Sequence, residues 1–368
     1  MRKPKVFFTN MWVTDEENQQ AKLARLIRQS GLGDIDMDKK YVAIKIHFGE
    51  MGNLAYLRPN YARTVVDAVK QLGGKPFLTD SNTLYVGYRK NALDHIDTAY
   101  TNGFSPFSTG CHILIGDGLK GTDDVEVPVP NGELVKKAKI GRAVMDADIV
   151  ISLTHFKAHE MSGIGGAIKN IGMGCASRAG KMEQHCDGKP EVDHALCIGC
   201  GKCIKICAFS APSITDRKAT IDQQRCVGCG RCIGVCPTDA ISNNSGTAES
   251  DMCKRMAEYA YAALNGRPHF HISLVTDVSP FCDCHSSNDV PIVPDVGMFA
   301  SMDPVALDQA CAEAVNKQPI QLGSILERSE STAKDYFTRI HPVTDWHVCL
   351  DHAAKLGLGS TEYELITI

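Results

Sequence analysis

Long apolar runs are missing from this sequence. No stretch approaches the roughly 18 apolar residues that a membrane-spanning helix requires. The apolar run near the first residues is too short for the core of a signal peptide. The formal net charge is only −4 over 368 residues, so electrostatics does not favour nucleic acid or a membrane surface as a partner. We therefore expect a cytoplasmic protein that binds neither nucleic acid nor a membrane.

Several motifs of common enzyme classes are absent as well. No Gly-x-Ser-x-Gly elbow is present, which argues against a hydrolase of that type. No Gly-x-Gly-x-x-Gly follows an expected strand, so a nicotinamide site of that kind is unsupported. The glycine-rich stretch 163–172 does not have Walker A spacing, and the cysteine triad of radical-SAM enzymes is also missing.

The first half of the chain alternates between strand-like and helix-like patterns. β-branched runs that end in turn residues predict strands, and apolar residues at helical spacing predict helices. The expected strands are 5–9, 41–48, 76–79, 112–115 and 148–153. The expected helices are 16–30, 60–72 and 135–147. This rhythm predicts an α/β domain with a largely parallel sheet and helices on both faces.

A change in composition near residue 188 interrupts this rhythm. Cysteines become frequent there, and periodic helices return only after the turn-like segment 243–246. Helices are then expected at 249–264, 304–315 and 345–356, with a strand at 271–275. We interpret residues 1–187 and 248–368 as two parts of one α/β domain, and residues 188–247 as an inserted module.

Cysteine is abundant, with sixteen in the chain, and the spacing of eight of them indicates a specific cofactor. Two runs follow the bacterial ferredoxin pattern C-x2-C-x2-C-x3-C, in which the fourth cysteine of each run ligates the other cluster. One predicted [4Fe–4S] cluster has the ligands Cys197, Cys200, Cys203 and Cys236. The other has Cys226, Cys229, Cys232 and Cys207. This segment resembles the two-cluster bacterial ferredoxins, although Ala208 stands where that family usually has proline.

Polar residues follow several expected strands of the α/β domain. In an open α/β sheet, ligands bind beyond the carboxyl ends of the strands. Glycines at 163–166 would let the backbone approach a ligand closely. The candidate catalytic residues in these positions are His47, Asp80, His155, His159 and Lys169.

A second cluster of candidate ligands is Cys282-Asp-Cys284-His285. Two thiolates and an imidazole can share one soft metal ion, and the two thiols could instead form a redox pair. Cys175, His185 and Cys186 flank the module and could complete such a site. Cys253 and Cys311 lie in helical patterns, where a buried cysteine packs as a small apolar residue.

Four segments resemble the family called domain of unknown function 362. They are KIHFGE (45–50), LTDSNTLY (78–85), THFKAHEMSGIGGAIKNIGMG (154–174) and SMDPVALDQA (301–310). Members of that family often carry a ferredoxin module. The resemblance implies a cytosolic iron–sulfur protein, but it does not imply a particular reaction.

One of these segments is also similar to a segment of the nickel-pincer lactate racemases. The similarity consists of a histidine, a small-residue turn with paired glycines, and a lysine ten residues after the histidine. The matching residues here are His159, Gly163, Gly165, Gly166 and Lys169. In those enzymes the histidine binds nickel and the lysine anchors the cofactor. The similarity implies a shared scaffold with a ligand site at this loop.

Three functional hypotheses follow from the sequence. The first is an oxidoreductase, in which two clusters pass single electrons from a low-potential donor protein to a small-molecule substrate or a metal in the α/β domain. The second is a ferredoxin-type carrier without catalytic activity, and the third is a metal or cofactor maturation factor.

Overall fold

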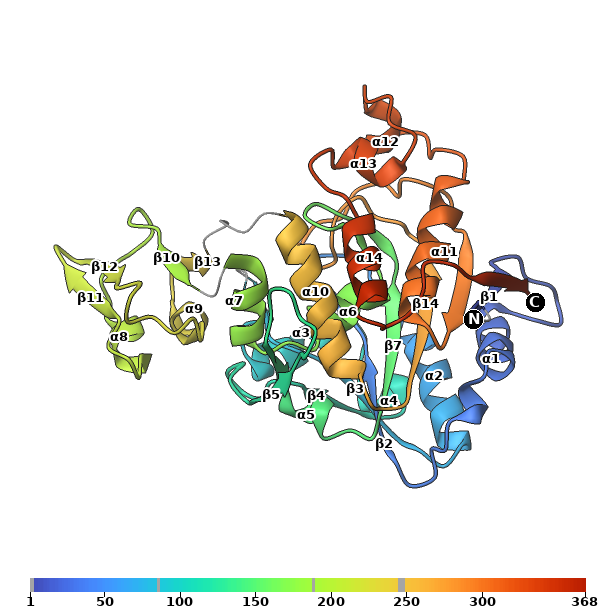
Figure 1. Cartoon of the computed structure of the whole chain (residues 1–368), viewed down its shortest axis with the longest axis horizontal. Helices are drawn as coiled ribbons and strands as arrows, with labels where there is room; N and C mark the ends of the chain where they lie inside the picture. Colours follow the sequence, from blue (N-terminus) through green and yellow to red (C-terminus); the bar gives the residue numbers. More distant parts are fainter. Residues whose placement is uncertain (1–2, 85–86, 187–188, 244–248) are drawn as a thin grey trace.

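An eight-stranded sheet forms the centre of the computed structural model, which describes residues 3–84, 87–186, 189–243 and 249–368 (Figure 1). The strand order is β16-β1-β15-β14-β7-β2-β3-β4. The bounds are β1 Lys5–Asn10, β2 Tyr41–Lys45, β3 Lys75–Asp80, β4 His112–Ile115, β7 Ile149–His155, β14 His269–Val275, β15 Gly297–Ser301 and β16 Glu364–Thr367. Only β15 pairs antiparallel with its two neighbours among these strands. The predicted, largely parallel sheet is therefore confirmed.

The central strands are apolar on both sides because helices cover both faces of the sheet. In β7, all seven residues are buried. Val150 packs into one core, whereas Ile149, Ile151 and Leu153 pack into the other.

The helices fall into two groups according to the core that they enter. One core contains residues from α1 Gln19–Gln29, α2 Pro59–Gln71 and α3 Ala92–Thr101. The opposite core contains residues from α6 Ala167–Gly172, α10 Glu249–Leu264, α11 Pro304–Asn316 and α14 His347–Lys355. In the part of the chain that the structure describes, no helix is long and apolar enough to cross a membrane.

Shorter elements connect and decorate this framework. The small helices are η1 Leu32–Asp34, α4 Pro106–Thr109, α5 Arg142–Met145, α7 Arg178–Cys186, α12 Ile325–Arg328 and α13 Tyr336–Ile340. Two antiparallel hairpins are formed by β5 Asp124–Pro128 with β6 Lys137–Gly141, and by β8 Lys157–His159 with β9 Gly163–Gly165.

The helix predicted over 135–147 is wrong. Residues Lys137–Gly141 form β6 instead, and only Arg142–Met145 is helical. The segment contains helix-favouring lysine and alanine, but β6 pairs with β5 along its whole length. Tertiary pairing therefore overrides a weak local preference here.

The cysteine-rich segment lies to one side of the sheet, at the left of Figure 1. It contains β10 Pro190–Val192, α8 Lys202–Ile206, β11 Pro212–Thr215, β12 Lys218–Ile221, α9 Arg231–Val235 and β13 Ile241–Asn243. Its first and last strands pair antiparallel, with Pro190 opposite Asn243. The predicted domain boundaries at 187/188 and 247/248 lie outside the described residues.

Candidate functional site

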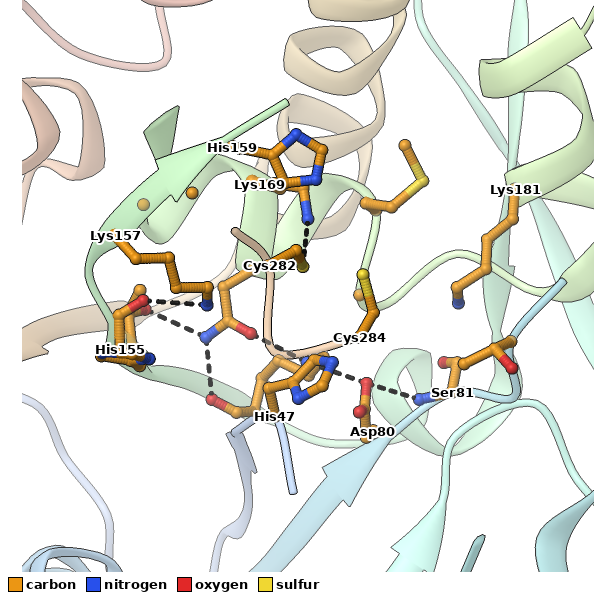
Figure 2. Close-up of a pocket in the computed structure, with 18 of the residues that line it drawn as sticks. His47, Asp80, Ser81, His155, Lys157, His159, Lys169, Lys181, Cys282 and Cys284 are labelled. Atoms are coloured by element: carbon orange, nitrogen blue, oxygen red, sulfur yellow. Dashed lines mark hydrogen bonds and ion pairs between the residues drawn. The ribbon is translucent and has the colours of Figure 1, made fainter. Parts of the chain in front are cut away.

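A cavity with a volume of ≈ 80 Å³ lies beyond the carboxyl ends of β2, β3, β7 and β14 (Figure 2). We call it the rim cavity. Seven of the eight residues predicted for the α/β site line it: His47, Asp80, His155, His159, Lys169, Cys282 and Cys284. His285 does not line it, and its ring points to Glu160 instead, with Nε2 2.7 Å from Oε1.

Asp80 ends β3 and is surrounded by basic side chains. Its Oδ1 lies 3.0 Å from the Lys45 ammonium, and its Oδ2 lies 3.6 Å from both Arg89 Nη1 and His95 Nε2. Burial alone would raise the pKa of Asp80, but Lys45 and His95 hold it well below its usual range. Asp80 is therefore an anion that organises cations and is poorly suited to proton transfer near neutral pH.

His47 follows β2 and lies between two donors. Its Nδ1 accepts a hydrogen bond from the Gly49 backbone N–H at 3.0 Å, and its Nε2 is 3.1 Å from Arg89 Nη1. Burial and the Arg89 guanidinium lower the pKa of His47 well below its usual value. Arg89 is itself paired with Glu50 at 3.0 Å, so His47 remains a neutral ring against a fixed cation.

His155 anchors the loop that carries the two thiols. Its Nδ1 is 2.9 Å from Asp283 Oδ2, and its Nε2 is 2.9 Å from the Thr276 carbonyl oxygen. The Lys157 ammonium lies 2.9 Å from the same Asp283 oxygen. Burial would raise the pKa of Asp283, but His155 and Lys157 lower it. Both ring nitrogens of His155 thus face acceptors within the protein, and the Asp283 contact ties the ring to the loop that carries Cys282 and Cys284.

His159 has one nitrogen that is fixed as an acceptor. Its Nδ1 accepts hydrogen bonds from the backbone N–H groups of Met161 and Ser162, at 3.1 and 3.2 Å. A nitrogen that accepts from N–H groups carries no proton, so the ring proton of His159 is on Nε2. The β8–β9 hairpin thereby presents a fixed N–H donor to the cavity.

Lys169 projects from α6 toward Cys282, with Nζ 3.4 Å from Sγ (Figure 2). The start of α6 is fixed by Asp308 of α11, whose carboxylate accepts from Ala167 N at 2.6 Å and Ile168 N at 2.9 Å. A Cβ on Gly166 would lie 2.4 Å from this carboxylate. The glycine-rich stretch therefore brings α6, and Lys169 with it, close to the cavity.

The two cavity thiols differ in their surroundings. A hydrogen bond from Cys284 and the Lys169 ammonium lower the pKa of Cys282 well below its usual value, although burial opposes them. The same thiol–thiol hydrogen bond, together with burial, raises the pKa of Cys284. The nearby Lys169 ammonium therefore favours the thiolate form at Cys282 over that at Cys284.

Two sets of donor atoms are close enough to consider as metal ligands. The donors of His159, Cys282 and Cys284 lie within 4.8 Å of one another, as do those of Glu160, Cys284 and His285. The predicted trio Cys282, Cys284 and His285 is therefore divided between two groups. Cys284 belongs to both.

Some cavity residues were not predicted from the sequence. Lys45, Arg89 and Lys181 all line the cavity. Burial lowers the pKa of Lys181 to about 8, and its ammonium donates to the Ala176 carbonyl oxygen at 2.6 Å. Lys45 could have been noticed as a charge within an otherwise apolar strand, whereas Arg89 and Lys181 lie in segments with no recognisable signal.

The eight cysteines of the two ferredoxin-like runs line two separate small cavities. The first hollow is lined by Cys197, Cys200, Cys203 and Cys236, and the second by Cys207, Cys226, Cys229 and Cys232. Each hollow thus combines three cysteines of one run with the fourth of the other. Gly201 and Gly230 have positive φ, 73° and 65°, which lets the chain turn sharply before α8 and α9.

An apolar cluster joins the first hollow to the rim cavity. Leu84, which lines the cavity, belongs to the same buried cluster as Met182, Cys197 and Cys203. Arg178 makes a further contact with the cysteine-rich segment, because its guanidinium lies against Gly234 of α9. A Cβ added at Gly234 would be 2.2 Å from Arg178 Nη1. The cysteine-rich segment is therefore packed against the wall of the cavity.

The remaining cysteines are mostly packing residues. Cys253 and Cys311 belong to the core as predicted, and Cys175 is buried in the same core. His185 lines the rim cavity, and burial lowers its pKa to about 3. The side chain of Cys186 lies outside the described residues.

Comparison with known proteins identifies a family but no function. The family described as "Domain of unknown function (DUF362)" matches residues 42–313. No curated protein matches.

Ten solved chains are similar to this one. The lactate racemase apoprotein from Thermoanaerobacterium thermosaccharolyticum has a TM-score of 0.42 and 13% identity, over 74% of this chain and 51% of that one. A structural-genomics protein from Thermotoga maritima has a TM-score of 0.42 and 11% identity, over 82% of this chain and 59% of that one. The chain thus spans only a little more than half the length of these two proteins.

Proposed function

The chain belongs to the domain of unknown function 362 family, and from this premise we propose that it is an iron–sulfur oxidoreductase. Two [4Fe–4S] sites would exchange single electrons with a reaction site in the rim cavity. A low-potential donor protein would supply the electrons, and the substrate would be a small molecule. We place this activity in the cytoplasm, where thiols stay reduced.

The two hollows fit the proposed clusters because each gathers four thiols. Cubane clusters are held by four cysteine thiolates, and in two-cluster ferredoxins the fourth cysteine crosses over between runs. The backbone N–H of Ala219 donates to Cys197 Sγ at 3.3 Å, and that of Ala211 donates to Cys207 Sγ at 3.4 Å. When bound, such clusters supply one-electron transfer at a potential that these hydrogen bonds help to set.

The observation that carries this proposal is the apolar cluster shared by the first hollow and the rim cavity. Leu84 borders the cavity, and it belongs to the same buried cluster as Met182, Cys197 and Cys203. A cysteine-rich segment that served only external partners would have no need to pack against the cavity wall. The contact therefore favours the oxidoreductase over a carrier without catalytic activity.

The charges in the cavity support a small anion as substrate. Lys45, Arg89 and Lys157 each have a carboxylate partner. In the contacts described, Lys169 is instead bonded to a sulfur and Lys181 to a carbonyl oxygen. These two ammonium groups can hold an anionic substrate, while His47 offers a neutral ring beside it.

Iron and acid-labile sulfide measured on anaerobically purified protein test the cluster assignment. We expect about eight irons per chain, and about four after Cys200→Ser removes an exposed ligand of the first hollow. Cys111→Ala is the control, because Cys111 is a buried thiol outside both hollows and the cavity. Full iron in Cys200→Ser, or zinc in place of iron, would contradict the assignment.

Stopped-flow oxidation separates an enzyme from a carrier. Protein reduced with dithionite, and then freed of dithionite, should be reoxidised by a small-molecule substrate without any partner protein. Leu84→Ala should slow this reoxidation while iron content stays unchanged. Reoxidation that always requires a second protein would support the carrier instead.

A second candidate function, metal delivery, is favoured by the closeness of the His159, Cys282 and Cys284 donors. It predicts one zinc, nickel or cobalt per chain that a chelator removes without loss of iron. Protein that contains iron alone would exclude it.

A further inference from the structure

The environment of Cys282 is that of a stabilised thiolate. The Lys169 ammonium lies 3.4 Å from its sulfur. The donor atoms of His159 and Cys284 lie within 4.8 Å of the sulfur and of each other. Cys282 itself is 1% exposed, whereas Cys284 is partly exposed. Both cysteines line the rim cavity, and Cys282 is the one whose sulfur lies beside the Lys169 ammonium.

The hydrogen bonds of His159 argue against a metal at this position. A histidine that binds a metal almost always donates its second ring N–H to a carbonyl, carboxylate or water. Here the second nitrogen, Nδ1, accepts from two backbone N–H groups instead. The proton is then on Nε2, so that nitrogen has no lone pair for a metal and can donate a hydrogen bond to a sulfur.

We propose that Cys282 and Cys284 form a redox-active dithiol that reduces small anionic disulfides in the rim cavity. Cys282 is the attacking thiolate, and Cys284 is the resolving thiol. The thiol chemistry does not depend on the iron–sulfur sites. Only the return of the pair to its reduced state rests on the function proposed above.

The reaction balances without any further reactant. The Cys282 thiolate attacks one sulfur of the substrate, a new S–S bond forms, and the substrate S–S bond breaks to release a thiolate. That thiolate takes the proton of Cys284, and the Cys284 thiolate attacks Cys282 and releases the second half. The protein pair is oxidised to a disulfide, and the substrate is reduced to one thiol and one thiolate, which takes its proton from the solvent.

Return to the reduced thiolate–thiol pair requires two electrons and one proton. A one-electron donor, such as reduced methyl viologen or a low-potential iron–sulfur protein, delivers the electrons one at a time. The two sulfurs lie within 4.8 Å of each other, so a small movement of the loop would bring them to bonding distance.

The charge of the cavity selects the substrate class. Lys169 and Lys181 line the cavity, and in the contacts described neither ammonium has a carboxylate partner. Asp80 also lines it, but its two oxygens already face Lys45, Arg89 and His95. A carboxylate on the disulfide would therefore be attracted to the two lysines, whereas a neutral disulfide of the same size would not.

The test uses two disulfides of similar size, dithiodiglycolate as the anionic probe and bis(2-hydroxyethyl) disulfide as the neutral one. Reduced holoprotein is mixed with each probe, quenched in acid, alkylated and mapped by peptide mass spectrometry. We expect the peptide with Cys282 and Cys284 to lose two hydrogens, at least about tenfold faster with the anionic probe. Lys181→Met should reduce this preference, and Cys111→Ala should leave it unchanged.

Variants distinguish the two sulfurs. Cys284→Ser should accumulate a mixed disulfide at Cys282, whereas Cys282→Ser should form no adduct at Cys284. Lys169→Met should slow the reaction of Cys282 about tenfold or more by removing the cation, and Lys169→Arg should restore part of the rate. If one variant does not fold, the peptide map of the unaltered protein still shows whether Cys282 and Cys284 become linked.

Three results would overturn the proposal. These are oxidation that leaves Cys282 and Cys284 unlinked, an adduct that forms first on Cys284, or a stoichiometric zinc or nickel ion bound to these thiols. Iron content is measured in the same samples. Disulfide formation in protein without iron would refute the proposed cluster function while supporting the dithiol.

Discussion

Asp283 is the residue on which the geometry of the thiol loop depends. It is fully buried and lies 2.9 Å from both His155 Nδ1 and the Lys157 ammonium. Removing one partner of a buried ion pair leaves the other charge without compensation, which typically costs about 3–5 kcal/mol. We therefore expect Asp283→Ala to lower the free energy of unfolding by that amount in urea denaturation.

The control for Asp283→Ala is an ion pair at the surface. Lys137 and Glu126 lie 3.1 Å apart with both side chains more than half exposed, and such pairs contribute little. Glu126→Ala should leave the urea midpoint almost unchanged. Equal effects of the two substitutions would mean that Asp283 does not hold the loop.

Lys181 gives the cavity a pH dependence. Its pKa is about 8 in the folded protein because burial disfavours the charged form, whereas an unfolded lysine titrates near about 10.4. The groups that act on it are Asp117, Asp80, Lys45 and Cys175. Between these two pH values the unfolded chain binds more protons, so the contribution of Lys181 to stability rises with pH.

The prediction is tested with Lys181→Met. At pH 7 the native state of the original protein carries a buried charge that the variant lacks. The free energy of unfolding of the variant should therefore exceed that of the original protein most at pH 7. Its advantage should shrink by pH 10. Chemical denaturation at the two pH values measures this difference, and an advantage that does not change with pH would contradict the lowered pKa.

At the scale of residues, the sequence could predict which groups gather but not how they are paired. His47, Asp80 and His159 were predicted because polar residues after parallel strands meet at one edge of the sheet. The partners Arg89 and Asp283 approach from other segments, through contacts that no local pattern encodes. The sequence does not show that His155 contacts Asp283, so it could not reveal that this histidine is tied to the thiol loop.

Among the elements, α6 is the one whose position matters most for the site. It carries Lys169, and its last residue, Gly172, lies so close to α10 that a Cβ would be 2.1 Å from the Met256 carbonyl oxygen. An added methyl group must therefore push α6 away from α10. We expect Gly172→Ala to lower the free energy of unfolding by about 1–3 kcal/mol, as overpacking typically does.

Gly33→Ala is the matched control, because a Cβ at Gly33 meets nothing within 4 Å. Its stability should be unchanged or slightly higher, since alanine restricts the unfolded chain. Thermal unfolding of both variants tests this. Gly172→Ala should also slow alkylation of Cys282, because Lys169 moves with α6, and an unchanged rate would contradict this coupling.

Prediction of the elements worked where burial and propensity agree. The β7 strand and the α10 helix were predicted because an apolar β-branched run and a long periodic pattern are both strong local signals. Residues 135–147 were mistaken for a helix because their own sequence pattern does not reveal the pairing with β5. That pairing makes Lys137–Gly141 a strand. The antiparallel β15 was not predicted, since its short run Gly297–Ser301 begins with glycine and lacks strict alternation.

For the whole molecule, Arg178 is one of the residues at the contact between the cysteine-rich segment and the sheet domain, together with the Lys90–Asp239 ion pair. The Arg178 guanidinium donates to the Lys120 carbonyl oxygen at 2.6 Å and to that of Lys90, and it lies against α9. Arg178→Ala should loosen this packing. Hydrogen exchange should then become faster in residues 189–243 and stay unchanged in the central sheet strands.

Arg225→Ala is the control for this experiment, because Arg225 is an exposed residue of the same segment. It should leave hydrogen exchange as it is. The opposite outcome is that Arg178→Ala accelerates hydrogen exchange throughout the central sheet. That result would mean that residues 189–243 and the sheet unfold as one unit, and it would contradict the prediction.

The pairing of β10 with β13 has a consequence for how this molecule can change. Because Pro190 lies opposite Asn243, the chain leaves and rejoins the α/β domain at almost the same point. All eight proposed cluster ligands lie between these two positions. Because none of the described residues between these two positions belongs to a strand of the central sheet, a deletion or exchange of this segment would leave the strand order of the central sheet unchanged.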